Sequence, residues 1–189
     1  MSSSWLLVAL VASAVYFLSG PKEGFQDSNL EQRLRRKTQK LVSFLQEKYP
    51  NDFRTHRLAS RDWTRNMKKL ARGLNQAGKT INKNVVYVCT DTQEDDNTAF
   101  FVVLHELAHV ITCSIGHEDD FWDNMRFLID VSIRAGLYSF EDYQKRPKEY
   151  CGQPIRGNPY ACVLNNTCKV AYEPNLSACG LRGRRDSRK

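Results

Sequence analysis

Apolar side chains between residues 28 and 78 recur every three or four positions, which is the spacing of one face of a helix. The first helix is predicted to begin at the capping box S-N-L-E, residues 28–31, and to end before Pro50. A second amphipathic helix is predicted to end near Gly78. The apolar positions are Leu30, Leu34, Leu41, Val42, Leu45 and Tyr49 in the first helix, and Trp63, Met67, Leu70 and Leu74 in the second.

The apolar pattern changes in the middle of the chain. Residues 85–89 (V-V-Y-V-C) are mostly β-branched or aromatic, which predicts a strand. After an acidic loop, the stretch from Asn97 or Thr98 to about Thr112 is apolar on nearly every side, so we expect a helix in the core. Another helix is predicted over residues 119–135, ending at Gly136. These elements, several helices and one strand, predict an α+β fold that is mostly α.

The chain begins with an apolar segment. Residues 5–18 carry no charge, and Trp5 and Tyr16 suit a membrane interface. We therefore predict a single-pass transmembrane helix within residues 1–20, followed by a polar linker over residues 21–27. The alternatives are a cleaved signal peptide, whose usual basic start is missing here, and a buried helix. Because basic residues follow the segment, the positive-inside rule places the body of the chain on the cytosolic side.

Composition narrows the class of protein. Of the 189 residues, 41% are hydrophobic and 26% are charged, which excludes a disordered chain and a protein with several membrane spans. Lys and Arg number 28 and Asp and Glu number 21, so the net charge is +7. This excess favours an anionic neighbour, either a membrane surface or a nucleic acid. Residues 182–189 form a basic C-terminal tail.

The predicted core helix contains the motif H-E-x-x-H, as His105-Glu106-Leu107-Ala108-His109. Two histidines four positions apart lie on one helix face and can bind one Zn²⁺ ion, while the glutamate beside them can accept a proton from water. Burying these groups among apolar residues without partners would be costly, which strengthens the metal interpretation. The structural alternative is that both histidines are satisfied by backbone groups or carboxylates.

A catalytic zinc ion needs a third protein ligand, and His117 is the best candidate. On a continuous helix His117 would point about 120° away from His105, so the chain must turn back at Ile115 and Gly116. The other candidates, as ligands or as residues that orient a ligand, are Glu118, Asp119, Asp120 and Asp123. The metzincin pattern is excluded because it would require different residues at positions 112 and 115.

H-E-L-A-H followed by G-H-E-D-D-F-W at residues 116–122 resembles the WLM and SprT-like zinc peptidases. The resemblance implies a minimal zincin-like domain, to which we assign residues 28–150, with a short sheet beside the active helix. It also implies that the strand at residues 85–89 is the edge of that sheet, where a substrate backbone could pair. The implied roles are metal ligands His105, His109 and His117, general base Glu106, and packing aromatics Phe121 and Trp122.

A second resemblance concerns the layout of the chain. An N-terminal apolar segment followed by K-E-G-F at residues 22–25 resembles membrane-associated virion proteins of large DNA viruses of algae and amoebae. This resemblance implies a minor capsid or membrane-scaffold role, located in the virion or its internal membrane. The implied partners are capsid or other virion proteins.

Four cysteines lie in the C-terminal segment, residues 151–181, namely Cys151, Cys162, Cys168 and Cys179. They lack the paired spacing of a zinc ribbon, so we predict two disulfides among them, in a pairing that the sequence does not choose. Cys89 and Cys113 are expected to be free buried thiols, and Cys113 could approach the metal. Disulfides conflict with a cytosolic body, a conflict that a lumenal location or a viral thiol oxidase would resolve.

The function predicted from these features is a membrane-anchored zinc metallopeptidase that acts on a protein or peptide substrate. Zinc would polarise the scissile carbonyl, and Glu106 would move a proton from the attacking water to the leaving amine. Tyr87, Tyr138 and Tyr143 are candidates for an oxyanion donor, although core packing would also explain each of them. The alternatives are a structural virion protein on a peptidase-like fold and a DNA–protein crosslink repair peptidase, for which no nucleic-acid-binding extension is apparent.

Overall fold

The structure is a computed structural model, and it describes residues 29–71, 75–90, 95–176 and 179. The predicted anchor at residues 1–20, the linker at residues 21–27 and the basic tail at residues 182–189 lie outside these residues. The elements run in the order α2 (Leu30–Lys48), α3 (Phe53–Ala59), α4 (Trp63–Asn66), β1 (Met67–Lys69), β2 (Gly78–Ile81), β3 (Val85–Val88), α5 (Asp96–Ile111), α6 (Asp119–Arg134), β4 (Lys148–Tyr150), β5 (Gln153–Ile155) and α7 (Ala161–Leu164).

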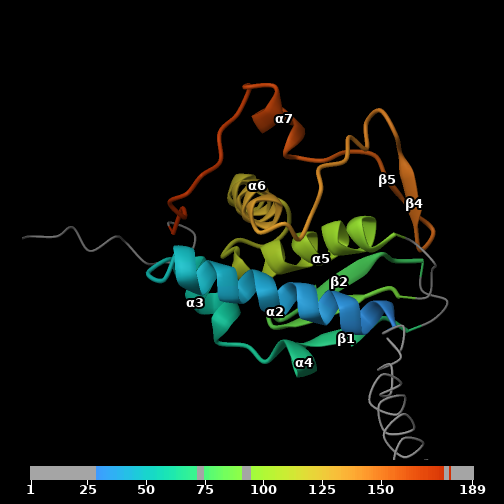
Figure 1. Cartoon of the computed structure of the whole chain (residues 1–189), viewed down its shortest axis with the longest axis horizontal. Coiled ribbons are helices and arrows are strands. Elements are labelled where there is room, and N and C mark those ends of the chain that lie inside the picture. The colour runs from blue at the N-terminus through green and yellow to red at the C-terminus, as the bar shows by residue number, and fades with distance from the viewer. Residues whose placement is uncertain (1–28, 72–74, 91–94, 177–178, 180–189) are drawn as a thin grey trace, which may run out of the picture.

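Helix α5 lies at the centre of the fold. It packs against α6 on one side and against β2 and β3 on the other, while α2 and α3 cover its flank (Figure 1). Leu104, Leu107 and Ala108 are fully buried on it, as expected for a helix that is apolar on nearly every side. The prediction of a core helix here is confirmed.

The ends of the long helices follow from local side chains. Asn29 caps α2 by accepting a hydrogen bond from the Gln32 amide at 3.0 Å, and Asp95 caps α5 by accepting one from the Thr98 amide at 2.7 Å. Helix α6 ends before Gly136, whose φ is +67°. The predicted positions of these three helices are confirmed to within a few residues.

The sheet corrects two predictions. Its strand order is β1-β3-β2, with β1 parallel and β2 antiparallel to β3. Strand β3 coincides with the strand predicted at residues 85–89, but it is the central strand, and β2 is the edge beside α5. The prediction of a second amphipathic helix is wrong. That segment forms only the four-residue helix α4, and the chain then enters β1 at Met67. Pairing with β3 buries Met67 and Leu70, so tertiary contacts override the helical spacing.

The disulfides also differ from the prediction. All six cysteines are paired, as Cys89–Cys151, Cys113–Cys179 and Cys162–Cys168. The expectation of free thiols at Cys89 and Cys113 is therefore wrong, since each of them pairs with a cysteine of the C-terminal segment. The two long-range disulfides close loops of 62 and 66 residues, and each is expected to stabilise the fold by about 4 kcal/mol.

The predicted membrane topology and location need correction. Among the residues that the structure describes, none of the helices combines the length and the apolar character needed to cross a bilayer. The described structure thus gives no support for the single-pass anchor predicted at residues 1–20, which lie outside it, or for the cytosolic orientation inferred from that anchor. Three disulfides instead indicate an oxidising environment for the folded chain.

The C-terminal segment arches over α6 from the hairpin β4–β5 toward α3 (Figure 1). A buried arginine fastens it there. The Arg54 guanidinium pairs with Asp52 at 2.7 Å and donates hydrogen bonds to the carbonyl oxygens of Ala171 at 2.8 Å and Tyr172 at 2.5 Å. The guanidinium carbon lies 3.4 Å from the centroid of the Phe127 ring on α6. One buried cation thus joins α3, α6 and the C-terminal segment.

Candidate metal centre

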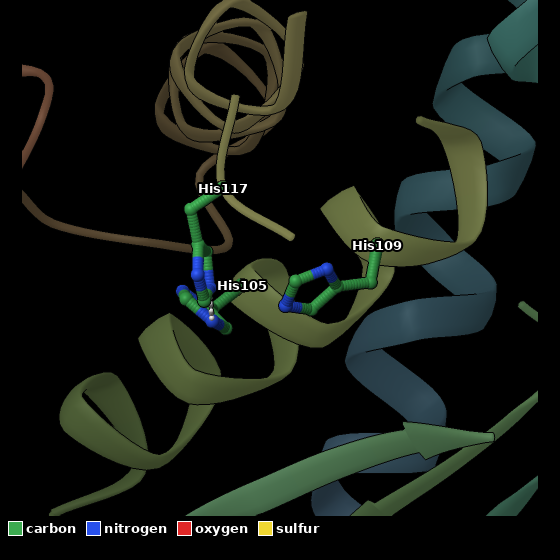
Figure 2. Close-up of side chains that lie close together, drawn as sticks. All are labelled: His105, His109 and His117. Atoms are coloured by element: carbon green, nitrogen blue, oxygen red, sulfur yellow. Dashed lines mark hydrogen bonds between the residues drawn. The ribbon is translucent and has the colours of Figure 1, made fainter. Parts of the chain in front are cut away.

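Three histidines converge beside α5. His105 and His109 project from consecutive turns of the helix, and His117 reaches them from the loop that precedes α6 (Figure 2). The His117 and His105 Nε2 atoms are 3.0 Å apart, and the potential ligand atoms of all three histidines lie within 4.8 Å of one another. In the described part of the chain, this is the one cluster of histidine, cysteine or acidic side chains that could hold a metal ion.

The loop that carries His117 is fixed from several directions. Gly116 adopts a φ of +88°, the left-handed turn that the sequence predicts at this position. The Lys83 ammonium donates hydrogen bonds to the carbonyl oxygens of Thr112 at 2.7 Å and Ser114 at 2.5 Å, beside the carboxyl end of α5. The Ser114 hydroxyl donates in turn to Asp120 at 2.5 Å. Asp120 is therefore not a member of the histidine cluster but helps to position its third member.

The three imidazoles fit a metal ion. A tetrahedral zinc ion with Zn–N bonds of about 2.0–2.1 Å would place its ligand nitrogens about 3.3 Å apart, close to the 3.0 Å between the Nε2 atoms of His105 and His117. Two ring nitrogens at 3.0 Å need a proton or a cation between them, because their lone pairs would otherwise repel. The donor set therefore suits an ion such as Zn²⁺, with three protein ligands and room for a fourth.

The surroundings keep the imidazoles of His105 and His109 in the neutral form that binds metals. Burial, reinforced by His109 and His117, lowers the pKa of His105 to about 3. Burial, reinforced by His117 and Lys83, lowers the pKa of His109 to about 4. The ring of Phe121 packs against all three imidazoles, with centroid distances of 5.0 Å to His105 and 4.5 Å to each of the other two. Trp122 stacks on His117 at 5.7 Å.

Glu106 lies beside the cluster, between α5 and the edge strand β2. Its Oε2 accepts a hydrogen bond from the Thr80 hydroxyl at 2.7 Å, which leaves Oε1 free of that contact. Burial raises the pKa of Glu106 to about 7, and the hydrogen bond from Thr80 opposes that rise. A carboxyl group with such a pKa can take up and release a proton near neutral pH.

A groove passes over the site and consists of two pockets. The histidine pocket, of 550 Å³, is lined by the three histidines, Glu106 and the β2–β3 hairpin. The hairpin pocket, of 510 Å³, lies between residues 75–78 and residues 153–157. Both pockets are lined by Gly78, His105 and Glu106, so they meet at the candidate site. A substrate lying along the groove would pass directly over these groups.

The other candidate residues take different places. Cys113 is in a disulfide and so cannot bind a metal as a thiolate. Tyr138 and Tyr143 pack on Phe101, and neither lines the groove. Tyr87 is cross-strand partner of Lys79, on the sheet face opposite to that of the buried Val86. The histidine cluster does not include Glu118, Asp119 or Asp123. Glu118 is the N-cap of α6, and Asp123 forms an ion pair with Arg126 at 2.7 Å.

Sequence reasoning missed the residues that hold Glu106. Gly78 is one of them, because a Cβ atom there would lie 2.9 Å from Glu106 Oε1 and 3.0 Å from the Tyr87 carbonyl oxygen. Thr80 is the other. The short polar strand Gly78–Ile81 carries almost no strand signal by itself. A glycine two residues before a threonine becomes informative only once β2 is known to face the metal helix.

Fold and site together define an α+β domain with a three-histidine candidate metal centre and an adjacent buried glutamate. The chain is similar in sequence to several viral proteins. An aligned stretch of 83 residues is 41% identical to an uncharacterized protein of Invertebrate iridescent virus 3, and it covers 40% of this chain and 50% of that protein. A stretch of 61 residues is 43% identical to an uncharacterized protein of Acanthamoeba polyphaga mimivirus, and it covers 32% of this chain and 31% of that protein. A stretch of 79 residues is 33% identical to an uncharacterized protein of Invertebrate iridescent virus 6, and it covers 38% of this chain and 43% of that protein.

The chain thus spans half or less of the length of these relatives. No protein-family model and no solved structure matches it.

Proposed function

We propose that this protein is a zinc-dependent peptidase. The observation that carries the proposal is the position of Glu106, a buried carboxyl group that lines the same groove as three converging histidines. A site that only stabilised the fold would have no use for such a group, whereas water-dependent hydrolysis needs a base beside the metal. The resemblance of H-E-L-A-H and the following G-H-E-D-D-F-W to WLM and SprT-like peptidases supports the same function.

The roles of the residues follow from their positions. His105, His109 and His117 would hold zinc, which when bound supplies a Lewis acid for a carbonyl group and lowers the pKa of nearby water. Glu106 would accept a proton from the attacking water and later release it to the leaving amine. The Thr80 hydroxyl fixes Oε2 of Glu106, so Oε1 is the atom that would carry the proton.

The edge strand β2 gives the groove a means of holding a peptide. Within the described residues β2 pairs with β3 alone, so its other edge has backbone groups available for pairing. An extended peptide could add to that edge and pass over Glu106, with Ile115, which is 89% exposed, beside it in the histidine pocket. The relatives are viral proteins, so the substrate we propose is a viral or host polypeptide.

Zinc content tests the metal centre. We expect about one zinc ion per full-length chain, as in three-histidine catalytic sites. Replacing His117 by Ala removes one of three ligands and is expected to weaken zinc affinity by at least 10-fold, measured by competition with a chelator. The control is His56→Ala, because His56 is an exposed histidine outside the cluster. A folded protein that binds no zinc, or equal affinity in both variants, would refute the site.

Gly78 provides a second test, because its missing side chain leaves room for Glu106. Gly78→Ala is expected to displace the Glu106 carboxylate and to lower peptide hydrolysis by roughly 10²-fold, since small misplacements of catalytic groups have effects of this size. The measurement is kcat/KM on an unstructured peptide. Gly136→Ala is the control, because Gly136 follows α6, lines neither pocket and has no atom within 4 Å of its added Cβ. Its φ of +67° makes it a control for backbone strain as well. Equal activities of the two variants would contradict the proposed role of Glu106.

A further inference from the structure

We propose that the hairpin pocket binds the part of a peptide that follows the scissile bond, and that Arg156 selects peptides with a carboxylate there. This inference rests on the proposed function, because it names a substrate class for the same groove. Four features of the pocket carry it: the apolar floor, the fixed wall, the charge on its rim and the direction of the edge strand.

The floor of the hairpin pocket comes from the metal helix. Phe101 and Val102 lie on α5 within one turn of His105 and line the pocket. Pro154 and Ile155 of the hairpin line it from the other side. This lining suits an apolar side chain, placed next to Glu106 at the point where the two pockets meet.

The hairpin β4–β5 is held firmly against the rest of the fold. The disulfide Cys89–Cys151 joins it to the end of β3, and the Tyr150 hydroxyl donates to the Cys89 carbonyl oxygen at 2.6 Å. The Gln153 side-chain amide donates to the Asn75 carbonyl oxygen at 2.9 Å, across the pocket wall. The wall is therefore pre-formed, so peptide binding does not carry the entropic cost of ordering the hairpin.

Two ion pairs also hold the start of the hairpin. The Lys148 ammonium lies 2.6 Å from a carboxylate oxygen of Asp95, the N-cap of α5, and 2.6 Å from one of Glu141. The hairpin is thus attached both at the sheet and at the metal helix.

The rim of the hairpin pocket carries an unpaired positive charge. Arg156 is exposed and lines the pocket, and it forms no ion pair or side-chain hydrogen bond with any described residue. The acidic residue among the described residues that line this pocket is Glu106, at its far end. A guanidinium group binds a carboxylate through two parallel hydrogen bonds, so a carboxylate on the peptide is the complementary ligand.

The direction of β2 indicates that the carboxylate bound by Arg156 belongs to a residue after the scissile bond. Residues 75–77, before β2, line the hairpin pocket, and Asn82 and Lys83, after β2, line the histidine pocket. A peptide that pairs antiparallel with β2, the commoner arrangement of paired strands, runs in the opposite direction. Its N-terminal part therefore lies in the histidine pocket and its C-terminal part in the hairpin pocket, near Arg156.

A binding experiment tests the pocket without requiring catalysis. The protein is the full-length, zinc-loaded Glu106→Gln variant, and the readout is fluorescence anisotropy. The probes are three fluorescein-labelled peptides that share Ala-Ala-Phe-Leu: one continues with Glu and ends in an amide, one ends after Leu with a free carboxyl group, and one continues with Gln and ends in an amide. The first two peptides separate a side-chain carboxylate from a chain end, and the third has neither.

We expect at least one of the carboxylate peptides to bind about tenfold more tightly than the Gln amide, the effect of one charge-assisted pair. Adding Arg156→Glu should remove this preference. Adding Arg146→Glu, an equal charge change at an exposed residue that lines neither pocket, should leave it intact. Equal or undetectable binding of the three peptides, or an equal effect of the two substitutions, would overturn the inference.

Cleavage by the unmodified protein completes the test. Mass spectrometry of a peptide mixture should place the carboxylate within the residues that follow the cut, and Arg156→Glu should shift this preference to basic residues. Binding that depends on Arg156 without any hydrolysis would retain the pocket and refute the peptidase. Hydrolysis with the same sequence preference in both proteins would retain the peptidase and refute the role of Arg156.

Discussion

Replacing Glu106 by Gln is expected to lower peptide hydrolysis by roughly 10²–10⁴-fold while zinc remains bound. The amide has the same shape as the carboxylate, so it fits beside Gly78 and can still accept a hydrogen bond from Thr80. It cannot take up the proton that the attacking water must lose. The measurement is kcat/KM on an unstructured peptide, together with the zinc content of the same sample.

Two further variants make the result specific to the position of this carboxyl group. Glu106→Asp keeps the acid but shortens its reach, so we expect activity between those of Gln and the unmodified protein. Glu149→Gln removes an exposed carboxylate of the hairpin and should leave activity unchanged. Substantial hydrolysis by a zinc-loaded Glu106→Gln protein would refute the assignment of Glu106 as the base.

Replacing Arg54 by Ala is expected to lower the free energy of unfolding by about 3–5 kcal/mol. The substitution leaves the Asp52 carboxylate, with 8% of its side chain exposed, without its counter-charge. It also removes the donors that hold the carbonyl groups of Ala171 and Tyr172, and leaves a void against the ring of Phe127. Urea unfolding of the oxidised protein measures the change.

Two controls separate this buried ion pair from a generic loss of charge. Arg65→Ala breaks an ion pair with Asp62 at 3.5 Å in which the arginine side chain is 87% exposed, so it should change stability by less than about 1 kcal/mol. Arg54→Lys keeps the charge but loses the planar fork that reaches three acceptors, and should fall between the other two. A loss below about 1 kcal/mol for Arg54→Ala would contradict the role described for it.

The parts of the fold that the sequence predicts are those with a strong local signal. Helix α5 is recognisable because it is apolar on nearly every side, and the bend that brings back His117 is recognisable because Gly116 tolerates a positive φ. Each of these signals lies within a few residues of the structure it produces. The convergence of the three histidines could therefore be anticipated from residues 105–117 alone.

The parts that the sequence does not predict depend on contacts between distant segments. Strand β2 is short and polar, and only its pairing with β3 makes it an edge beside Glu106. Cys89 and Cys113 look like isolated buried thiols because their partners, Cys151 and Cys179, lie more than 60 residues away. The hairpin β4–β5 forms a wall of the groove through the same long-range contacts, so its contribution to the site is invisible in the local pattern.

These long-range disulfides have a consequence for the order in which the protein is made. Synthesis proceeds from the N-terminus, so β2, α5 and His117 are made before Cys151 and Cys179 have been added. The three histidines are thus made first, and the groove over them lacks one wall until the hairpin has been made and has folded. The wall of the groove is thus the last part of the site to form, and the disulfide Cys89–Cys151 then holds it in place.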